Sequence, residues 1–257
     1  MNPERSEPHS QTLAGRVILI TGATAGIGRS IALAMAQLGA TTLLLGRDVQ
    51  ALERLYDEIV GRDWPEPGLI PFDLAQYDAQ RLDELTAAIT AQYGKLHGLI
   101  HNAAILGDRV PFEHYSATVW DRVIKTNFEA PTALTRALLP LLRIPEMSAM
   151  VFLSSSVGAR PRAYWGAYAA SKYALEGLAM LLSEELENTS NIRINVVNPG
   201  ATRTGMRRAA YPAEDPSELR SPEALSELFT FLMAPDSGAK TGQRYQFDGS
   251  CAPLISA

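Results

Sequence analysis

The sequence is poor in cysteine and in positive charge. Its 257 residues include one cysteine, Cys251, so the chain cannot form an internal disulfide. We expect this thiol to be inert and the compartment to be reducing, hence cytoplasmic. The 23 Lys and Arg are outnumbered by 28 Asp and Glu, which gives a net charge of -5. No basic excess is left to neutralise the phosphates of a nucleic acid, so we expect no nucleic-acid partner.

The N-terminus lacks a long apolar run. Residues 1–10 are polar and charged and include Pro3 and Pro8. They have neither the apolar core of a signal peptide nor the length of a membrane span. We therefore expect a flexible tail over residues 1–12 and no contact with a membrane.

The sequence also lacks the patterns typical of a hydrolase site and of a metal site. A Gly-x-Ser-x-Gly elbow is absent, and the four histidines, at 9, 97, 101 and 114, do not flank a nucleophile. This argues against a hydrolase. One cysteine and scattered histidines give no metal-ligand spacing, so we expect no metal.

The sequence does contain an alternation of strand-like apolar runs and helical patterns. Strands are expected to begin at residue 17 and to cover 41–45, 69–73, 96–101, 149–154, 192–197 and 244–247. Helices are expected from the first turn to residue 38 and over 48–60, 78–93, 116–142, 165–187 and 222–233. The alternation predicts one α/β domain over residues 13–257. Its core would be a doubly wound (Rossmann) parallel sheet of about seven strands with helices on both faces. Ligand would then bind at the carboxyl ends of the strands.

A glycine-rich turn between the first strand and the first helix is the most informative stretch. It reads Thr-Gly-Ala-Thr-Ala-Gly-Ile-Gly over residues 21–28. Gly22 can take the tight turn, Gly26 lets the backbone approach a pyrophosphate, and Gly28 lets the helix pack on the strand. The helix N-terminus would face the phosphates. An ordinary glycine turn is the alternative.

The end of the second strand indicates which dinucleotide binds. Gly46 and Arg47 stand where a carboxylate would bind the ribose 2′-hydroxyl of NAD. A guanidinium there can hold the 2′-phosphate of NADP instead. NADP is therefore favoured. The alternative is that Arg47 is a solvated loop residue and Asp48 only caps the next helix.

Two further strand ends carry candidate cofactor contacts. Asp73 and Leu74 follow the third strand and lie where the adenine edge is expected, although a turn role for Asp73 is almost as good an explanation. Asn102 and Ala103 follow the fourth strand, where a structural role for the asparagine competes with cofactor contact.

Candidate chemistry follows the fifth strand. Tyr168 and Lys172 are four residues apart at a helix start, so both lie on one helix face, although such spacing also arises by chance. A phenol working near pH 7 needs its pKa lowered by about 3 units, or roughly 4 kcal/mol. One cation at about 4 Å supplies on the order of that energy. Ser155 can donate a hydrogen bond to the oxygen on which charge develops, while Ser154 or Ser156 more simply caps the turn.

Together these motifs resemble the short-chain dehydrogenase/reductase family from about Leu13 to Gly249. The resemblance rests on the glycine motif, an Asn-Ala pair at 102–103, Asn127, the set Ser155, Tyr168 and Lys172, and Pro199-Gly200-x-x-x-Thr204. Two departures stand out. Ala104 replaces the family's usual glycine, and no basic residue precedes Gly26.

The resemblance implies carbonyl reduction with NADP(H) and a homodimer or homotetramer. It makes Tyr168 the general acid/base, and Lys172 the residue that lowers the tyrosine's pKa and holds the nicotinamide ribose. Ser155 would orient the carbonyl, and Asn127 would hold a water in a proton relay. The implied cofactor contacts are Gly22, Thr24, Gly26, Ile27, Gly28, Arg47, Asp73, Leu74, Asn102, Ala103, Tyr168, Lys172, Pro199, Gly200, Thr202 and Thr204, with Thr202 and Thr204 at the carboxamide. A catalytically silent NADP-binding module that acts through protein partners is the alternative.

The stretch after the sixth strand, residues 204–212, bears on the substrate. It is expected to be a loop that closes over a small-molecule substrate, with Trp165 as an apolar wall. Arg207 and Arg208 are most simply a solvated pair. The sharper hypothesis is that they attract an anionic compound such as a carrier-bound or coenzyme-A-bound 3-oxoacyl chain.

Overall fold

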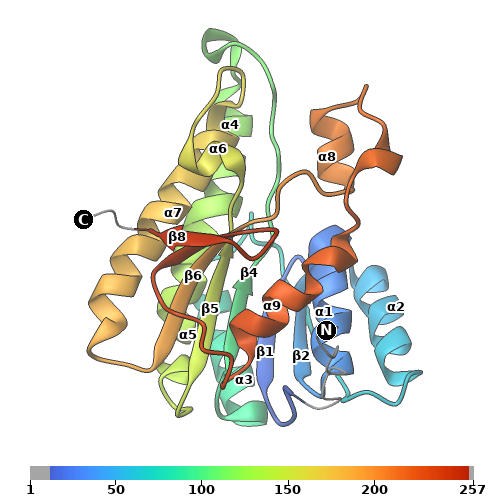
Figure 1. The fold of residues 1–257 in the computed structure, drawn as a ribbon, viewed down its shortest axis with the longest axis vertical. Coiled ribbons are helices and arrows are strands. Elements are labelled where there is room, and N and C mark those ends of the chain that lie inside the picture. The colour runs from blue at the N-terminus through green and yellow to red at the C-terminus, as the bar shows by residue number, and fades with distance from the viewer. Residues whose placement is uncertain (1–11, 255–257) are drawn as a thin grey trace, which may run out of the picture.

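The computed structural model describes residues 12–254, and all its strands form one sheet (Figure 1). The predicted tail over 1–12 lies almost entirely outside the described residues, so it stays a prediction, as does the single domain over 13–257. The strand order is β3-β2-β1-β4-β5-β6-β7-β8. The strands are β1 (Val17–Thr21), β2 (Thr41–Gly46), β3 (Gly68–Pro71), β4 (Gly98–His101), β5 (Ser148–Leu153), β6 (Ile192–Asn198), β7 (Gln243–Gln246) and β8 (Cys251–Pro253).

The sheet confirms the predicted fold class. Strands β1 to β7 pair in parallel, and β8 alone runs antiparallel, against β7. The chain winds outward from β1 in one direction to β3 and then crosses back to β4 on the other side. This reversal between β1 and β4 is where doubly wound sheets open a ligand crevice.

Helices cover both faces of the sheet (Figure 1). They are α1 (Gly26–Gln37), α2 (Val49–Val60), α3 (Ala79–Tyr93), α4 (Ala117–Ile124), α5 (Ala130–Leu142), α6 (Ser156–Ala159), α7 (Gly166–Glu187), α8 (Gly205–Ala210) and α9 (Ser226–Met233). Short 3₁₀ turns occupy Phe112–His114, Pro216–Glu218 and Pro222–Leu225. Among residues 12–254, no helix combines the length and the apolar composition needed to cross a bilayer.

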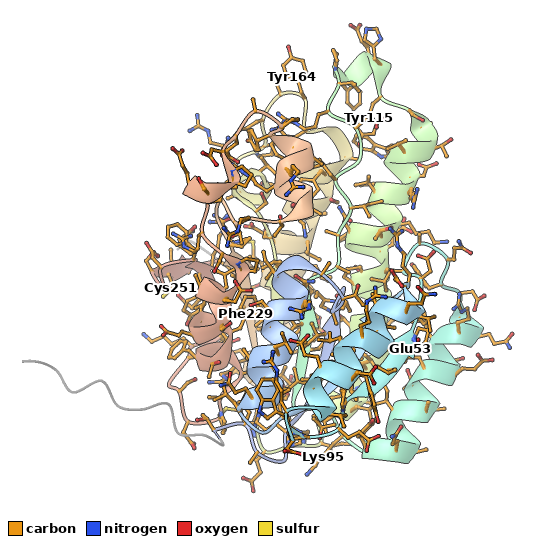
Figure 2. All side chains as sticks on the ribbon, turned by 90° about the vertical axis from the view of Figure 1, so that its right-hand side faces the viewer. Glu53, Lys95, Tyr115, Tyr164, Phe229 and Cys251 are labelled. Atoms are coloured by element: carbon orange, nitrogen blue, oxygen red, sulfur yellow. The ribbon has the colours of Figure 1, made fainter. Side chains whose placement is uncertain are left out.

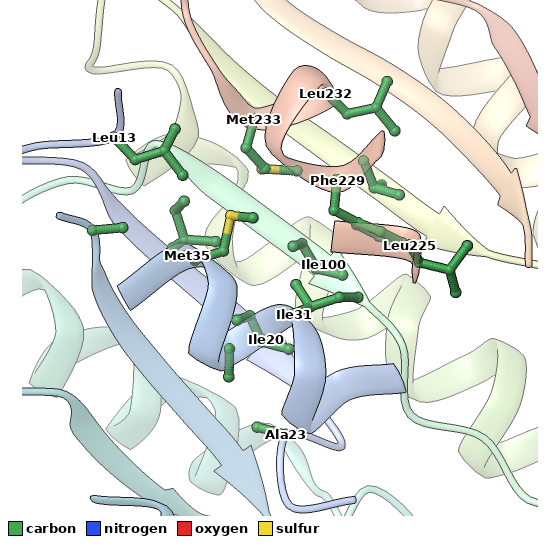
Figure 3. Close-up of a cluster of buried hydrophobic side chains, with 14 of the residues drawn as sticks. Leu13, Ile20, Ala23, Ile31, Met35, Ile100, Leu225, Phe229, Leu232 and Met233 are labelled. Atoms are coloured by element: carbon green, nitrogen blue, oxygen red, sulfur yellow. The ribbon is translucent and has the colours of Figure 1, made fainter. Parts of the chain in front are cut away.

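Side-chain alternation along the strands creates two buried cores. Ile18 and Ile20 of β1 face α1, α2 and α9 and pack with their apolar residues. Figure 3 shows part of this cluster, with residues of α1 and α9 near Ile20. Leu19, between Ile18 and Ile20, faces the opposite side, where α3, α5 and α7 pack. Since successive strand residues point to opposite faces, a strand buried on both sides is apolar throughout. This explains the unbroken run Val-Ile-Leu-Ile in β1.

Acidic caps start two of the predicted helices. Asp48 accepts a hydrogen bond from the Ala51 amide at 3.0 Å at the start of α2. Asp78 does the same with the Arg81 amide at 2.8 Å at the start of α3. Gly94 ends α3 in the left-handed region with φ +69°. These are the positions at which the sequence places helix boundaries.

The structure corrects several expected elements. The helix expected over 116–142 is interrupted by a π-helical turn at Lys125–Glu129 that contains Asn127. The segment 204–212, expected as a loop, contains α8, which Thr204 caps by accepting from the Arg207 amide at 3.1 Å. Helix α6 and strand β8 were not expected at all. These elements are short, so they depend on tertiary packing more than on local pattern.

Candidate active site

A cavity of about 440 Å³ opens at the carboxyl ends of the strands. In Figure 2, Tyr115 and Tyr164 mark this end of the molecule, and Lys95, just before β4, marks the opposite end. Most of the predicted site residues line the cavity: Gly22, Thr24, Gly26, Ile27, Arg47, Asp73, Leu74, Asn102, Ala103, Ser155, Tyr168, Lys172, Pro199, Gly200, Thr202 and Thr204. Gly28 and Asn127 are not among the lining residues.

The glycine turn is shaped by close backbone approach. Gly22 has φ +65°, and a Cβ on it would lie 2.9 Å from the Ala103 Cα. A Cβ on Gly28 would collide with the Gly22 carbonyl oxygen and with the Asn102 amide nitrogen. Gly28 therefore packs the first turn of α1 against the glycine loop, and of the three motif glycines Gly22 and Gly26 line the cavity.

The N-terminus of α1 has no side-chain cap. Ala25 occupies the cap position in extended conformation, with no side-chain hydrogen bond, and the first turn contains no acidic residue. The amide groups that begin a helix need an acceptor from elsewhere, and the positive end of the helix dipole favours an anion. Ala25, Gly26 and Ile27 line the cavity, so this end of the helix is suited to phosphate binding.

Arg47 reaches the cavity from the end of β2. It is exposed, and within residues 12–254 its side chain makes no hydrogen bond or ion pair. Asp48 beside it is occupied by the α2 cap. A Cβ on Gly46 would lie 3.1 Å from the Thr24 Cγ2, so a larger residue at 46 would crowd this corner. Arg47 is thus the cation at the site predicted for a ribose phosphate.

Asn102 and Asp73 both have structural partners. The Asn102 amide nitrogen donates to the carbonyls of Thr21 and Gly22 at 2.9 and 3.1 Å, and so fixes the glycine turn. Asp73 accepts from the Ala75 amide at 2.9 Å, which is the turn role considered for it. Both residues still line the cavity.

The Ser155, Tyr168 and Lys172 side chains meet at the inner wall of the cavity. Tyr168 and Lys172 are only 7% and 2% exposed. Lys172 Nζ lies 5.8 Å from the Tyr168 ring centroid and donates to the Leu153 carbonyl at 2.6 Å. Burial lowers the pKa of Lys172 to about 8, and the Glu176 carboxylate opposes that shift.

The expected lowering of the Tyr168 pKa is not found in the free protein. Burial raises the pKa of Tyr168 to about 12, and a hydrogen bond with Ser155 offsets only part of that effect. One nearby cation would lower the pKa of a solvated phenol, whereas this phenol is desolvated, which favours its neutral form. Tyr168 is therefore a protonated phenol at neutral pH.

Asn127 is held within the protein. It is completely buried, accepts from the Ile105 amide at 2.8 Å, and donates to the Ile105 carbonyl at 2.9 Å and to the Ser171 hydroxyl at 3.1 Å. Its amide group thus clamps the loop after β4 to α7. Ile105, which lines the cavity, was not predicted as a site residue.

An aromatic cluster forms the outer wall of the cavity. Trp165 lies with its ring centroid 5.8 Å from that of Tyr168 and 5.9 Å from that of Tyr211. The guanidinium of Arg109 stacks on both Trp165 and Tyr211, at 4.5 and 5.0 Å, and bonds to the Ala210 carbonyl. Arg109 was missed because its loop between β4 and α4 shows no motif.

Arg207 does not present a free charge. It forms a two-pronged ion pair with Glu214, at 2.6 and 2.5 Å, and stacks on Tyr211 at 3.9 Å. Arg208 is exposed and lines a smaller neighbouring hollow with Arg203 and Pro216 rather than this cavity. The two guanidinium groups therefore face different hollows, and that of Arg207 is already paired.

Comparisons with known proteins bear on the whole chain. A family model described as "short chain dehydrogenase" matches residues 16–215. The "Uncharacterized oxidoreductase YciK" of Escherichia coli strain K12 is 40% identical over 250 residues, covering 97% of this chain and 98% of that protein. A 3-oxoacyl-acyl-carrier-protein reductase, FabG of Thermotoga maritima, is 30% identical over 246 residues, covering 92% and 98%. A short chain dehydrogenase from Shigella flexneri 2a str. 301, complexed with NADP, matches with TM-score 0.90 and 40% identity, covering 93% and 99%.

Proposed function

We propose that this chain, which belongs to the short-chain dehydrogenase family, reduces a ketone or aldehyde to an alcohol with NADPH. One observation carries the proposal. The Ser155, Tyr168 and Lys172 side chains line the same cavity as the glycine turn, so a proton donor and a dinucleotide cradle share one space. A catalytically silent module would not need these three polar side chains in the cavity wall.

The cavity fits the phosphate groups of a dinucleotide cofactor. The uncapped end of α1 and the positive-φ Gly22, where a side chain would collide with Ala103, leave room and amide donors for a pyrophosphate. Arg47 offers a guanidinium without a partner in the described chain, which suits the 2′-phosphate that distinguishes NADP from NAD. When bound, NADPH supplies the hydride that the carbonyl carbon receives.

The protein's own residues supply the proton that the carbonyl oxygen receives. Tyr168 is protonated at neutral pH, as any tyrosine is, and burial raises its pKa further, so its phenol can give a proton to the carbonyl oxygen. Ser155 donates a hydrogen bond to the same oxygen and holds the carbonyl in place. The Lys172 ammonium then stabilises the phenolate that Tyr168 becomes. Hydride and proton together convert the carbonyl group to an alcohol.

The other predicted site residues keep their roles as proposals, with two changes. Asn127 is assigned to hold the Ile105 loop against Ser171, because these partners occupy its amide group. Gly28 supports the turn without contacting the cofactor. The proposed cofactor contacts are Gly22, Thr24, Gly26, Ile27, Arg47, Asp73, Leu74, Asn102, Ala103, Tyr168, Lys172, Pro199, Gly200, Thr202 and Thr204.

The outer wall of the cavity favours a neutral, apolar substrate. Trp165, Met206 and Tyr211 line it, and Arg207 is neutralised by Glu214. Apolar walls with few polar groups bind hydrophobic portions of a ligand. We therefore place aromatic or aliphatic ketones and aldehydes ahead of phosphate-bearing 3-oxoacyl compounds.

We further propose a cytoplasmic homodimer or homotetramer. Tyr173 and Leu181 on α7 are 59% and 55% exposed, an apolar side that a second copy can cover. The lone Cys251 suits a reducing compartment. Sedimentation of the purified protein at micromolar concentration tests the assembly, and a monomer would contradict it.

The decisive test measures NADPH oxidation with a panel of neutral aldehydes and ketones and with 3-oxoacyl thioesters. We expect turnover with some neutral carbonyl compounds, and slower turnover when NADH replaces NADPH. If NADPH binds tightly but no compound is reduced, the catalytically silent module becomes the better description.

A further inference from the structure

The catalytic loop after β5 is anchored at three successive residues. Lys172 Nζ donates to the Leu153 carbonyl at 2.6 Å, and the Ser154 hydroxyl donates to the Glu176 carboxylate at 2.5 Å. Arg244 Nη2 donates to the Ser155 carbonyl at 3.1 Å. Each anchor is a charged side chain, so the backbone that carries Ser155 is restrained at consecutive positions.

Glu176 and Arg244 form one buried pair. Arg244 Nε lies 3.2 and 3.1 Å from the two carboxylate oxygens of Glu176, and the two side chains are 15% and 11% exposed. The carboxylate therefore binds both Arg244 and Ser154, and Arg244 spans from Glu176 to the Ser155 carbonyl. A Cβ on Gly158 would lie 2.7 Å from a Glu176 oxygen, so α6 also packs closely over the pair.

The pair comes from two distant parts of the chain. On α7, positions 168, 172 and 176 repeat every four residues and share one face, so Glu176 lies about one turn after Lys172 and about two turns after Tyr168. Arg244 belongs to β7, where it pairs with Val196 of β6. A side chain of β7, the strand next to the sheet edge, thus contacts the loop after β5 that carries Ser155.

We propose that Glu176 and Arg244 are positioning residues: Arg244 fixes the main chain of Ser155, and Glu176 holds both Arg244 and the charge of Lys172 in place. The inference rests on the proposed function, since it explains how Ser155 and Lys172 of that site are held in position. Neither residue contacts the cavity itself, so neither is a catalytic residue.

Several charged or titratable groups bear on Lys172. Glu176 and Tyr168 lie on its own helix, and His101 approaches from β4, where the lysine charge lowers the histidine's pKa. Arg244 approaches from β7 through Glu176. Glu176 is the only anion among them, so loss of its charge is expected to make the lysine easier to deprotonate.

The first test uses the free protein and needs no turnover. The chain has four lysines, at 95, 125, 172 and 240, so selective labelling with ¹³Cε-lysine gives few resonances, and Lys172→Arg identifies that of Lys172. We expect Glu176→Gln to lower the titration midpoint of this resonance by on the order of one pH unit. Glu184→Gln, an exposed change on the same helix, is the matched control and is expected to leave it unchanged.

The second test separates positioning from stability. We expect Glu176→Gln and Arg244→Met to lower kcat about tenfold or more, the effect of losing a hydrogen bond to a charged group, with smaller changes in NADPH affinity. Arg244→Lys should recover part of the loss. The double variant Glu176→Met/Arg244→Met replaces the buried ion pair with apolar side chains, an exchange that proteins often tolerate without loss of stability. Its kcat should stay low even where its thermal midpoint matches the wild type.

Three results would decide against the proposal. One is a Lys172 midpoint in Glu176→Gln equal to that in Glu184→Gln. Another is a kcat in the single variants equal to that of the wild type. The third is a double variant whose kcat, as well as its thermal midpoint, returns to the wild-type value. Absence of turnover in the wild type would instead overturn the proposed function, while the titration would still decide whether Glu176 controls Lys172.

Discussion

The Lys172 ammonium lies over the face of the Tyr168 ring, 5.8 Å from its centroid, and gives its short hydrogen bond to a main-chain carbonyl. The two groups are desolvated together, and burial favours the neutral form of each. In the proposed reaction the tyrosine becomes an anion, and the attraction between the two groups is then at its greatest. The lysine thus acts mainly on the charge that develops during turnover.

The pH dependence of reduction should follow Lys172. Burial sets its pKa at about 8, so the ammonium is present below that pH and is lost above it. Because the phenolate needs this cation, we expect kcat for reduction to decline as pH rises through about 8, while Tyr168 stays protonated. Lys172→Met should be slow at every pH and lack this decline. A wild-type profile that is flat from pH 7 to 9.5 would contradict the assignment.

Tyr168→Phe should remove most of the turnover and leave cofactor affinity nearly unchanged. The substitution deletes the proton donor and keeps the ring that packs on Trp165. Tyr173→Phe, an exposed change on the same helix, is the control. Steady-state kinetics and quenching of protein fluorescence by NADPH measure the two effects. Substantial turnover in Tyr168→Phe would assign the proton to another group.

Arg47→Ala should weaken NADPH binding by about 1.5–3 kcal/mol, the range for a hydrogen bond to a charged group, and affect NADH little. Arg54→Ala on the exposed side of α2 removes the same charge without reaching the cavity, and it should leave both affinities unchanged. Calorimetric titration with each cofactor gives the comparison. Equal losses for NADPH and NADH would assign Arg47 to packing.

Stability should fall in mild acid because of His101. This ring is buried beneath Thr135 and Phe152, and burial, with help from Lys172, lowers its pKa to about 3. On unfolding, its pKa returns to about 6.5, so the unfolded chain binds one more proton between these values. The free energy of unfolding should therefore decrease as pH falls below about 6.5, by about 1.4 kcal/mol per pH unit for this group.

Urea titrations from pH 7 to 4.5 measure that slope. His101→Gln should make it shallower, whatever its own stability, and the exposed His114→Gln should not. His97, whose pKa burial lowers to about 4, adds a second contribution of the same sign. An identical slope in wild type and His101→Gln would mean that the buried imidazole is not linked to unfolding.

Arg207 and Arg208 should differ in their effect on the substrate. Arg207→Ala frees Glu214 and removes the cation stacked on Tyr211, so we expect a higher KM for neutral ketones through a disordered α8. Arg208→Ala should leave KM for neutral and for phosphate-bearing substrates unchanged. A selective loss of phosphate-bearing substrates in Arg208→Ala would revive the anionic-substrate hypothesis.

The parts of the fold that the sequence predicts are those fixed by short-range chemistry. The β1 run and the caps at Asp48 and Asp78 each depend on residues within a few positions. The family motif also predicts the cavity lining, because parallel strands bring their carboxyl ends together. The strand β8 was missed because its three exposed residues have no alternation to detect.

The electrostatic state of the site was not predictable in the same way. The spacing of Tyr168 and Lys172 places them on one face, but the burial that dominates both pKa values comes from β5, α6 and the Trp165 cluster packed around them. Likewise, nothing near Arg244 in the sequence indicates Glu176, since 68 positions separate them. Such pairs are fixed by the sheet order rather than by a motif.

The π-helical turn at Lys125–Glu129 makes this stretch sensitive to its length as well as to the side chain at position 127. A π turn contains one more residue than an α turn, and each helical residue rotates the chain by about 100°. Deleting Phe128 would let the helix run on unbroken, but it would turn the apolar side of α5 away from the sheet or carry Asn127 off Ile105. A one-residue gap in an alignment at this stretch would therefore mark a relative whose loop after β4 is held in some way other than by Asn127.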